Sequence, residues 1–163
     1  MNAARGTDVS VPTLAEAIPP GSSLLIDTSA ALAYLTGTET ASPAATELFD
    51  AFVATGRDRG ALSTVTVGEI LVRPFRAGQP AVAVAEGFLR HFAQLELIAV
   101  DYVIARRAAE IRAATHLRMP DALILASGME RAVDRLVTND QSLAVAARDL
   151  SLACCVLSEV RPS

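Results

Sequence analysis

The chain has 163 residues, with fourteen basic and eighteen acidic side chains that give a formal net charge of −4 and a sequence pI of about 5.1. All of the basic residues are arginine, and lysine is absent from the sequence. Several protein classes need a lysine in their usual form, among them P-loop nucleotidases, Schiff-base enzymes and aspartyl-phosphate proteins. The absence of lysine excludes these classes in that form.

The length suits one domain with a single substantial core. Hydrophobic residues make up 52% of the chain, above the roughly 45 to 50% of ordinary soluble domains, and this surplus indicates an oligomer interface. No apolar stretch approaches the roughly 18 to 20 residues that cross a bilayer, and the N-terminus lacks the pattern of a signal peptide. We therefore expect a cytoplasmic protein with no membrane segment.

Strand and helix patterns alternate from residue 22 onward, after an extension (1–21) that carries no strong periodicity and ends in a Pro-Pro-Gly turn. In chain order, we predict a strand at 22–27, a helix at 29–35, a helix at 43–55, a strand at 60–64 and a helix at 66–72 that Pro74 ends. There follow a helix at 80–93, a strand at 95–100, a helix at 102–117, a helix from Pro120, a strand at 135–138, a helix at 142–150 and a strand at 153–157.

This alternation predicts a three-layer α/β/α sandwich with a mainly parallel sheet of four to five strands, formed by a single domain over residues 22–163. In open parallel sheets, ligands bind beyond the carboxyl ends of the strands, near the point where the strand order reverses. The side chains that follow strands directly are therefore the first candidates for function.

Four acids stand at edges between strand and helix patterns, namely Asp27, Glu69, Asp121 and Asp140. Asp27 and Asp140 follow predicted strands, and the other two are predicted in the first turns of helices at the same sheet edge. An unpaired carboxylate costs several kcal/mol to remove from water, so acids beside buried segments are capped, paired or bound to a cation. We expect the four side chains to converge.

Three of the acids have a specific structural alternative, whereas Asp27 ends a strand buried on both faces, which has little need for a carboxylate unless a nearby helix or ion uses it. Glu69 stands three residues after Thr66 in a capping-box pattern and four residues before Arg73, where it could form an ion pair. Asp121 could simply favour the positive end of a helix, and Asp140 could cap the helix that follows it.

Four segments, in the same order along the chain, resemble the PIN-domain nucleases. Within that family, this short single-domain chain is similar to the VapC toxins of bacterial toxin–antitoxin pairs. They are 24–30 (LLIDTSA), 63–71 (STVTVGEIL), 119–124 (MPDALI) and 136–140 (LVTND). The resemblance implies that the four acids bind a metal ion and that Thr138 is the supporting hydroxyl beside the fourth acid. It further implies an RNA substrate, a cognate antitoxin protein that quenches the nuclease, and a homodimer of PIN domains.

Two features depart from the family pattern. Many relatives carry a further Asp or Asn two positions after the fourth acid, where this chain has Ser142. Relatives also often start close to the first Asp, whereas the extension at residues 1–21 precedes it here. The first departure leaves the number of metal ions open between one and two.

The chemistry also follows from the residues. Two unit charges about 4 Å apart interact by about 4 kcal/mol at an effective dielectric of 20, so four converging carboxylates need a cation. Oxygen ligands favour Mg²⁺ or Mn²⁺ over zinc, and such an ion supports phosphodiester hydrolysis. We assign Asp27, Asp121 and Asp140 to inner coordination and Glu69 to an outer-sphere or water-orienting role.

Nearby cations are the candidates for phosphate contacts, because arginine binds phosphate through its planar fork. They are Arg73, Arg76, Arg112, His116 and Arg118, although the same residues could form a solvated or antitoxin-facing surface. The function we predict is a divalent-metal-dependent endoribonuclease. The alternative is a PIN-like module that binds RNA or protein without cleaving it, which the intact set of four acids argues against.

Overall fold

The computed structural model describes residues 11–163 and contains a five-stranded sheet in which all neighbouring strands are parallel. The strands are β1 (Ser23–Ile26), β2 (Arg59–Ser63), β3 (Leu95–Ile98), β4 (Arg135–Thr138) and β5 (Ala153–Val156). Their order across the sheet is β3-β2-β1-β4-β5. The predicted α/β class and the parallel sheet are confirmed.

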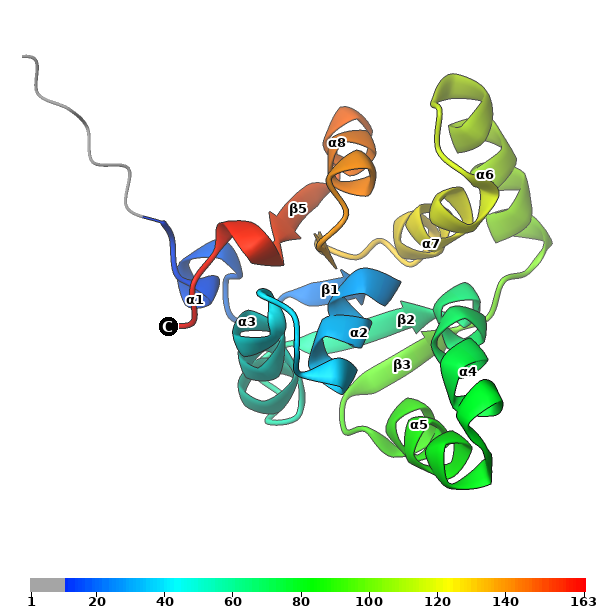
Figure 1. The fold of residues 1–163 in the computed structure, drawn as a ribbon. Helices are drawn as coiled ribbons and strands as arrows, with labels where there is room; N and C mark the ends of the chain where they lie inside the picture. Colours follow the sequence, from blue (N-terminus) through cyan, green and yellow to red (C-terminus); the bar gives the residue numbers. More distant parts are fainter. Residues whose placement is uncertain (1–10) are drawn as a thin grey trace, which may run out of the picture.

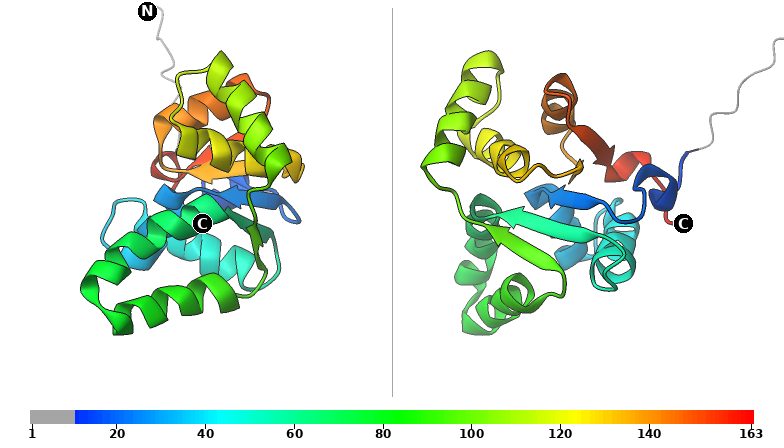
Figure 2. Two further views of the ribbon diagram at one scale, coloured as in Figure 1. Left: turned by 90° about the vertical axis from the view of Figure 1, so that its right-hand side faces the viewer. Right: turned by 180° about the vertical axis from the view of Figure 1, so that it is seen from behind.

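Helices cover both faces of this sheet (Figures 1 and 2). Helices α6, α7 and α8 lie on one face, and α2, α3, η1, α4 and α5 lie on the other. In chain order the helices are α1 (Leu14–Ala17), α2 (Thr28–Thr36), α3 (Ser42–Thr46), the π-helix η1 (Glu47–Val53), α4 (Thr64–Ala77), α5 (Gln79–His91), α6 (Tyr102–Ala114), α7 (Met119–Glu130), α8 (Gln141–Asp149) and the 3₁₀ turn η2 (Leu157–Glu159).

The central strand β1 is buried on both faces, so its apolar residues serve two separate cores. Leu24 and Ile26 pack with the α2, η1 and α5 side of the molecule, whereas Leu25 packs with α6, α7 and α8. Successive side chains of a strand point to opposite faces, which explains the continuous apolar run in the sequence.

The strand order reverses at β1, whose neighbours are β2 on one side and β4 on the other. Asp27 follows β1 directly, and Asn139 and Asp140 follow β4. The two acids therefore leave adjacent strands at the reversal point, where open parallel sheets bind ligands.

The helix that carries Glu69 differs from its prediction. It starts at Thr64 and continues to Ala77, with Pro74 inside it, instead of running from 66 to 72 and ending before the proline. Proline lacks an N–H and so removes one helical bond, but α4 is amphipathic, and packing of its apolar face, including the buried Ile70, outweighs that loss.

Two other boundaries also moved. The helix predicted at 43–55 forms as α3 followed by η1, whose wider turn is closed by a bond from the Ala54 N–H to the Phe49 carbonyl at 2.8 Å. The helix predicted to reach Leu117 ends at Ala114, so that residues 115–117 form a loop before α7.

Part of the predicted extension packs on the domain. Thr13 caps α1 in a capping box with Glu16, and the side chains of Leu14 and Ile18 are fully buried in the core beside β1. We therefore propose that the folded unit reaches back to Thr13, while residues 1–10 of the extension lie outside the described part of the chain. None of the helices within residues 11–163 is long and apolar enough to cross a membrane.

Candidate functional site

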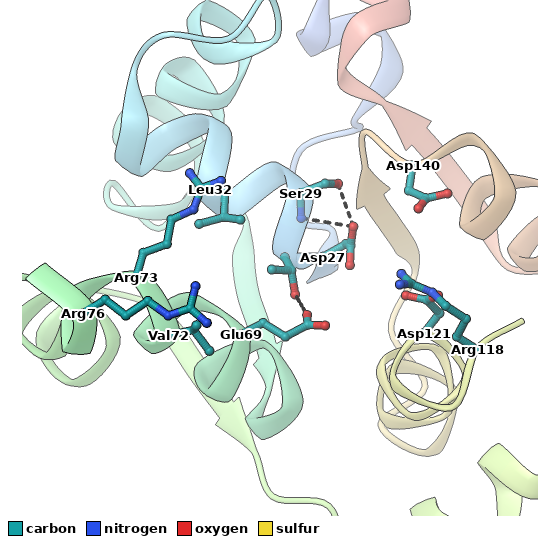
Figure 3. Close-up of a pocket in the computed structure, with 11 residues that line it drawn as sticks. Asp27, Ser29, Leu32, Glu69, Val72, Arg73, Arg76, Arg118, Asp121 and Asp140 are labelled. Carbon is teal, nitrogen blue, oxygen red and sulfur yellow. Dashed lines mark hydrogen bonds and ion pairs between the residues drawn. The ribbon is translucent and has the colours of Figure 1, made fainter. Parts of the chain in front are cut away.

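A cavity of about 460 Å³ opens at the carboxyl ends of the strands, between α2, α4 and α7 (Figure 3). All four predicted acids line it, together with three arginines and a small apolar wall. The lining residues are Asp27, Thr28, Ser29, Leu32, Glu69, Val72, Arg73, Arg76, Arg118, Asp121 and Asp140. Acids that lie as far apart in sequence as Asp27 and Asp140 thus share one cavity, as the sheet topology predicts.

Asp27 is the most buried of the four acids, with 4% of its surface exposed. It is the N-cap of α2, and its Oδ2 accepts bonds from the Ser29 N–H at 3.2 Å, the Ser29 hydroxyl at 2.6 Å and the Thr138 hydroxyl at 2.9 Å. One carboxylate oxygen therefore accepts all the hydrogen bonds that residues 11–163 make to this side chain, and these bonds hold it in a single orientation.

The Thr138 hydroxyl joins two of the acids. It donates to Asp27 and accepts the backbone N–H of Asp140 at 2.9 Å, and the threonine is fully buried. Asp140 in turn caps α8, because its Oδ1 accepts the N–H groups of Ser142 at 2.8 Å and Leu143 at 3.1 Å. The capping alternative for Asp140 is thus realised, but it occupies only one of the two carboxylate oxygens.

Glu69 has a different partner from both structural alternatives. Ser63, not Thr66, is the N-cap of α4, so Glu69 lies beyond the first turn and forms no capping box. Within the described residues it forms no ion pair with Arg73 either. Its Oε2 instead accepts the hydroxyl of Thr28, which is also bonded to Thr66 at 3.1 Å.

Asp121 forms an ion pair with Arg118, whose Nε lies 3.1 Å from Oδ2 of the acid. The aspartate side chain is 15% exposed and the arginine side chain is 77% exposed. The hydrogen bond and charge of Asp121 raise the pKa of Arg118 above its ordinary value, with smaller contributions from the charges of Asp140 and Glu69. The guanidinium therefore lies in the field of three of the four acids.

The acids share a pattern: in each, one carboxylate oxygen is bonded to the protein and the other accepts no hydrogen bond within residues 11–163. The free oxygens are Asp27 Oδ1, Glu69 Oε1, Asp121 Oδ1 and Asp140 Oδ2. Oxygen-only donors of this kind suit Mg²⁺ or Mn²⁺. In the described part of the chain, however, no three acids, histidines or cysteines stand close enough to hold an ion together in this arrangement.

The predicted phosphate contacts divide into two groups. Arg73, Arg76 and Arg118 line the cavity, the first two on the α4 wall and the third beside Asp121 (Figure 3). Arg112 and His116 do not line it. His116 lies instead in the loop before α7, on a second hollow beside α8.

The sequence prediction did not single out two cavity residues that bond directly to the acids. Ser29 bonds to Asp27, accepts the Asn139 N–H at 2.8 Å and lies 3.3 Å from the Thr138 hydroxyl, while Thr28 holds Glu69. Their signal was the hydroxyl pair that follows Asp27 in the Asp-Thr-Ser segment. Side chains next to a buried acid at a helix start are placed to bond to it.

Comparisons with known proteins agree with the fold. A family model described as the PIN domain matches residues 24–149. A toxin–antitoxin complex from Klebsiella pneumoniae is similar at 22% identity, with a TM-score of 0.59 over 76% of this chain and 91% of that one.

Two further solved structures show the same fold. A VapC toxin of Mycobacterium tuberculosis, described as cleaving the sarcin–ricin loop, matches at 18% identity and a TM-score of 0.62 over 77% of this chain and 95% of that chain. The FitAcB structure from Neisseria gonorrhoeae matches at 17% identity and a TM-score of 0.61 over 83% and 97% of the two chains. No curated protein matches the chain.

Proposed function

The chain belongs to the PIN-domain family, and from that premise we propose that it is a divalent-metal-dependent endoribonuclease, the toxin of a toxin–antitoxin pair. One observation carries the proposal: four acids from separate elements line one cavity, and each keeps a carboxylate oxygen that accepts no bond from residues 11–163. A cap such as Asp101 also bonds through one oxygen, so the support comes from four such acids meeting on one cavity.

The roles of the acids follow from how they are held. Asp27, Asp121 and Asp140 would hold Mg²⁺ or Mn²⁺ through their free oxygens. When bound, the ion supplies a Lewis acid that polarises the phosphate and makes water more acidic. Glu69 lies across the cavity on α4, where its free oxygen can orient a water molecule and accept its proton.

The arginines provide the counter-charge for RNA. Arg73 and Arg76 lie on the wall of the cavity opposite Asp121 and Asp140 (Figure 3). A phosphate group between these walls would meet guanidinium donors on one side and the acids with their cation on the other. The acidic net charge of the chain therefore does not prevent it from binding RNA.

The partners follow from the same proposal. Solved toxin–antitoxin complexes share the fold, and an antitoxin would quench the nuclease by covering its cavity. Exposed apolar side chains at Val72, Phe75 and Val84 on α4 and α5 could be buried by that partner or in a homodimer. We place the activity in the cytoplasm, where its RNA substrate would be found.

The decisive experiment compares Asp27→Asn with wild type in RNA cleavage with Mg²⁺ or Mn²⁺. Cleavage should fall by at least about 100-fold, because loss even of groups that only support metal ligands costs 10- to 100-fold. Asp101→Asn is the matched control, since Asp101 caps α6 at 2.9 Å from the Ile104 nitrogen, outside the cavity. Full cleavage by Asp27→Asn, with circular dichroism showing an unchanged fold, would refute the assignment.

The second candidate is a PIN-like module that binds RNA or protein without cleaving it. It is favoured by the spacing of the acids, which within residues 11–163 form no cluster tight enough to hold an ion as they stand. Titration with Mn²⁺ in a calorimeter separates the two. A nuclease binds the ion and loses that binding in Asp27→Asn, whereas absence of binding by wild type favours the module.

A further inference from the structure

A second hollow adjoins the acidic cavity and is used by none of the chemistry above. It has a volume of about 500 Å³ and lies between the loop 115–117 and the outer face of α8. Figure 1 shows α8 and the end of α6 standing beside each other above the sheet. The volume is within the 300 to 1,000 Å³ typical of small-molecule sites.

The two hollows meet across two short pieces of chain. Leu117 lines the second hollow and the next residue, Arg118, lines the acidic cavity. On the facing side, Ser142 lines the second hollow and Asp140 lines the cavity. A ligand held at the acids can therefore extend into the second hollow over a ridge that carries Arg118.

The surface of the hollow combines an apolar floor with polar groups at its rim. Leu117 and Ala146 are 9% and 6% exposed and form the floor, with Val145 beside them at 52%. His116 and Asp149 stand at the rim, and within residues 11–163 neither side chain has a hydrogen-bond or ion-pair partner.

The loop that forms one wall is held in place. The Thr115 hydroxyl donates to the Ile111 carbonyl at 2.8 Å and accepts the Leu117 N–H at 3.3 Å. This pair of bonds ends α6 and turns Leu117 inward. The hollow is thus formed by bonded backbone rather than by side chains free to fill it.

We propose that this hollow binds one unpaired nucleobase of the RNA strand whose scissile phosphate lies at the acids. The inference rests on the proposed function and deepens it by naming a specificity subsite. An apolar floor packs against the face of a base, and unpaired bases in single-stranded RNA are read through their edges. On the ridge, Arg118 uses only Nε for Asp121 among the described contacts, so its two terminal nitrogens can bind the connecting phosphate.

The free carboxylate of Asp149 sets the preference among bases. A carboxylate accepts from an exocyclic amino group, as Glu and Asp do from cytosine. Uracil has no exocyclic amino group and offers only its ring N3–H as a donor on that edge. The subsite therefore favours cytosine, adenine or guanine over uracil at one position beside the cut.

The first test fills the hollow with Val145→Trp and compares it with Val103→Trp. Val103 lies on α6 outside both hollows and is similarly exposed, at 54% against 52% for Val145. Binding of fluorescein-labelled single-stranded RNA is measured by anisotropy in EDTA, so that no cleavage occurs. The Kd should rise by about 10-fold in Val145→Trp, because the indole occupies the space of the base, and should not change in Val103→Trp.

The second test removes the base from the RNA instead of filling the hollow in the protein. A series of RNAs with one abasic position each should reveal a single position that costs wild type about 10-fold in Kd. That cost should vanish in Val145→Trp, because the filled hollow cannot hold the base. An equal abasic cost in both proteins, or an unchanged Kd in Val145→Trp, overturns the proposal.

The third test needs no bulky side chain. Asp149→Asn should reduce the preference for cytosine over uracil at that position, and it decides the matter if Val145→Trp misfolds. Unchanged discrimination overturns the subsite, as does a Val145→Trp variant that loses antitoxin binding but retains RNA binding. Wild type that cleaves no RNA but keeps the base-dependent binding refutes the nuclease and leaves the subsite standing.

Discussion

The two buried acids at opposite ends of the sheet, Asp58 and Asp27, are bonded in different ways. At the amino ends of the strands, Asp58 has a fully buried side chain, and both of its oxygens are bonded: Oδ1 accepts the Ser22 N–H at 2.8 Å and Oδ2 pairs with Arg57. The guanidinium of Arg57 also donates to the Ile18 carbonyl at 2.8 Å and lies 3.7 Å above the Phe52 ring. Both carboxylate oxygens of Asp58 therefore have partners within the protein.

At the carboxyl ends, the four cavity acids are bonded at only one of their two carboxylate oxygens within residues 11–163. Each is oriented through one oxygen and leaves the other without a described partner. Burial does not distinguish Asp27 from Asp58, which are 4% and 1% exposed, but the number of bonded carboxylate oxygens does. Of these two buried acids, Asp58 is therefore satisfied by the fold at both oxygens, whereas Asp27 keeps one oxygen without a described partner on the cavity.

The largest expected effect on stability is at the amino end. Asp58→Asn should lower the free energy of unfolding by about 3 kcal/mol, because removing one partner of a buried ion pair leaves the other charge uncompensated. Glu96→Gln is the control, since its exposed pair with Arg131 should be worth less than about 1 kcal/mol. Urea unfolding curves measure both variants. A loss as small as that of the control would show that the buried pair of Asp58 contributes no more to the free energy of unfolding than an exposed pair does.

Thr138→Val tests whether an oriented acid at the carboxyl end matters for chemistry. Asp27 would lose a bond and the Asp140 N–H its acceptor, so Mn²⁺ affinity and cleavage should fall by about 10- to 100-fold. Thr55→Val removes an exposed hydroxyl that donates to the Ala51 carbonyl at 2.7 Å and does not line the cavity, and it should leave both quantities unchanged. Calorimetry and cleavage assays on folded protein provide the measurement, and equal behaviour of the two variants would contradict it.

Arg118→Gln should separate metal binding from RNA binding. Its exposed pair with Asp121 is worth about 0.2 to 1 kcal/mol, so removing this competing cation should raise Mn²⁺ affinity by up to about 5-fold. RNA affinity should fall, because a phosphate contact is lost. Arg131→Gln, which breaks a surface pair outside the cavity, should change neither. Both affinities moving in the same direction would show that Arg118 does not compete with the cation.

The smallest effect concerns an exposed acid at the amino end. Bonds from the Ser23 N–H and hydroxyl, both at 2.7 Å, lower the pKa of Asp134 below its ordinary value of 3.8. A lowered pKa stabilises the fold above about pH 4, and this contribution is lost as the pH falls through the folded value. Asp134→Asn should therefore cost less than about 1 kcal/mol at pH 7, and urea unfolding at pH 3 should show a smaller difference. A constant difference would reject this assignment.

Local patterns predicted most of the elements and the edge of the sheet where the four acids share a cavity. The strand-then-acid arrangement at Asp27 and Asp140 needs only the apolar run and the residue after it, so both positions could be read from the sequence. Glu69 was harder. Its capping box with Thr66 satisfied a local rule, yet α4 begins earlier, at Thr64, because Ser63 caps it.

The sequence by itself determined the α/β class, the parallel sheet and the candidate acids, because hydrophobic period and strand–acid order are properties of neighbouring residues. Only the tertiary structure decided that α4 passes through Pro74, that Thr28 holds Glu69 and that Thr138 joins Asp27 to Asp140. Those contacts join residues 41 and 111 positions apart. They depend on how helices pack against the sheet, which no local period encodes.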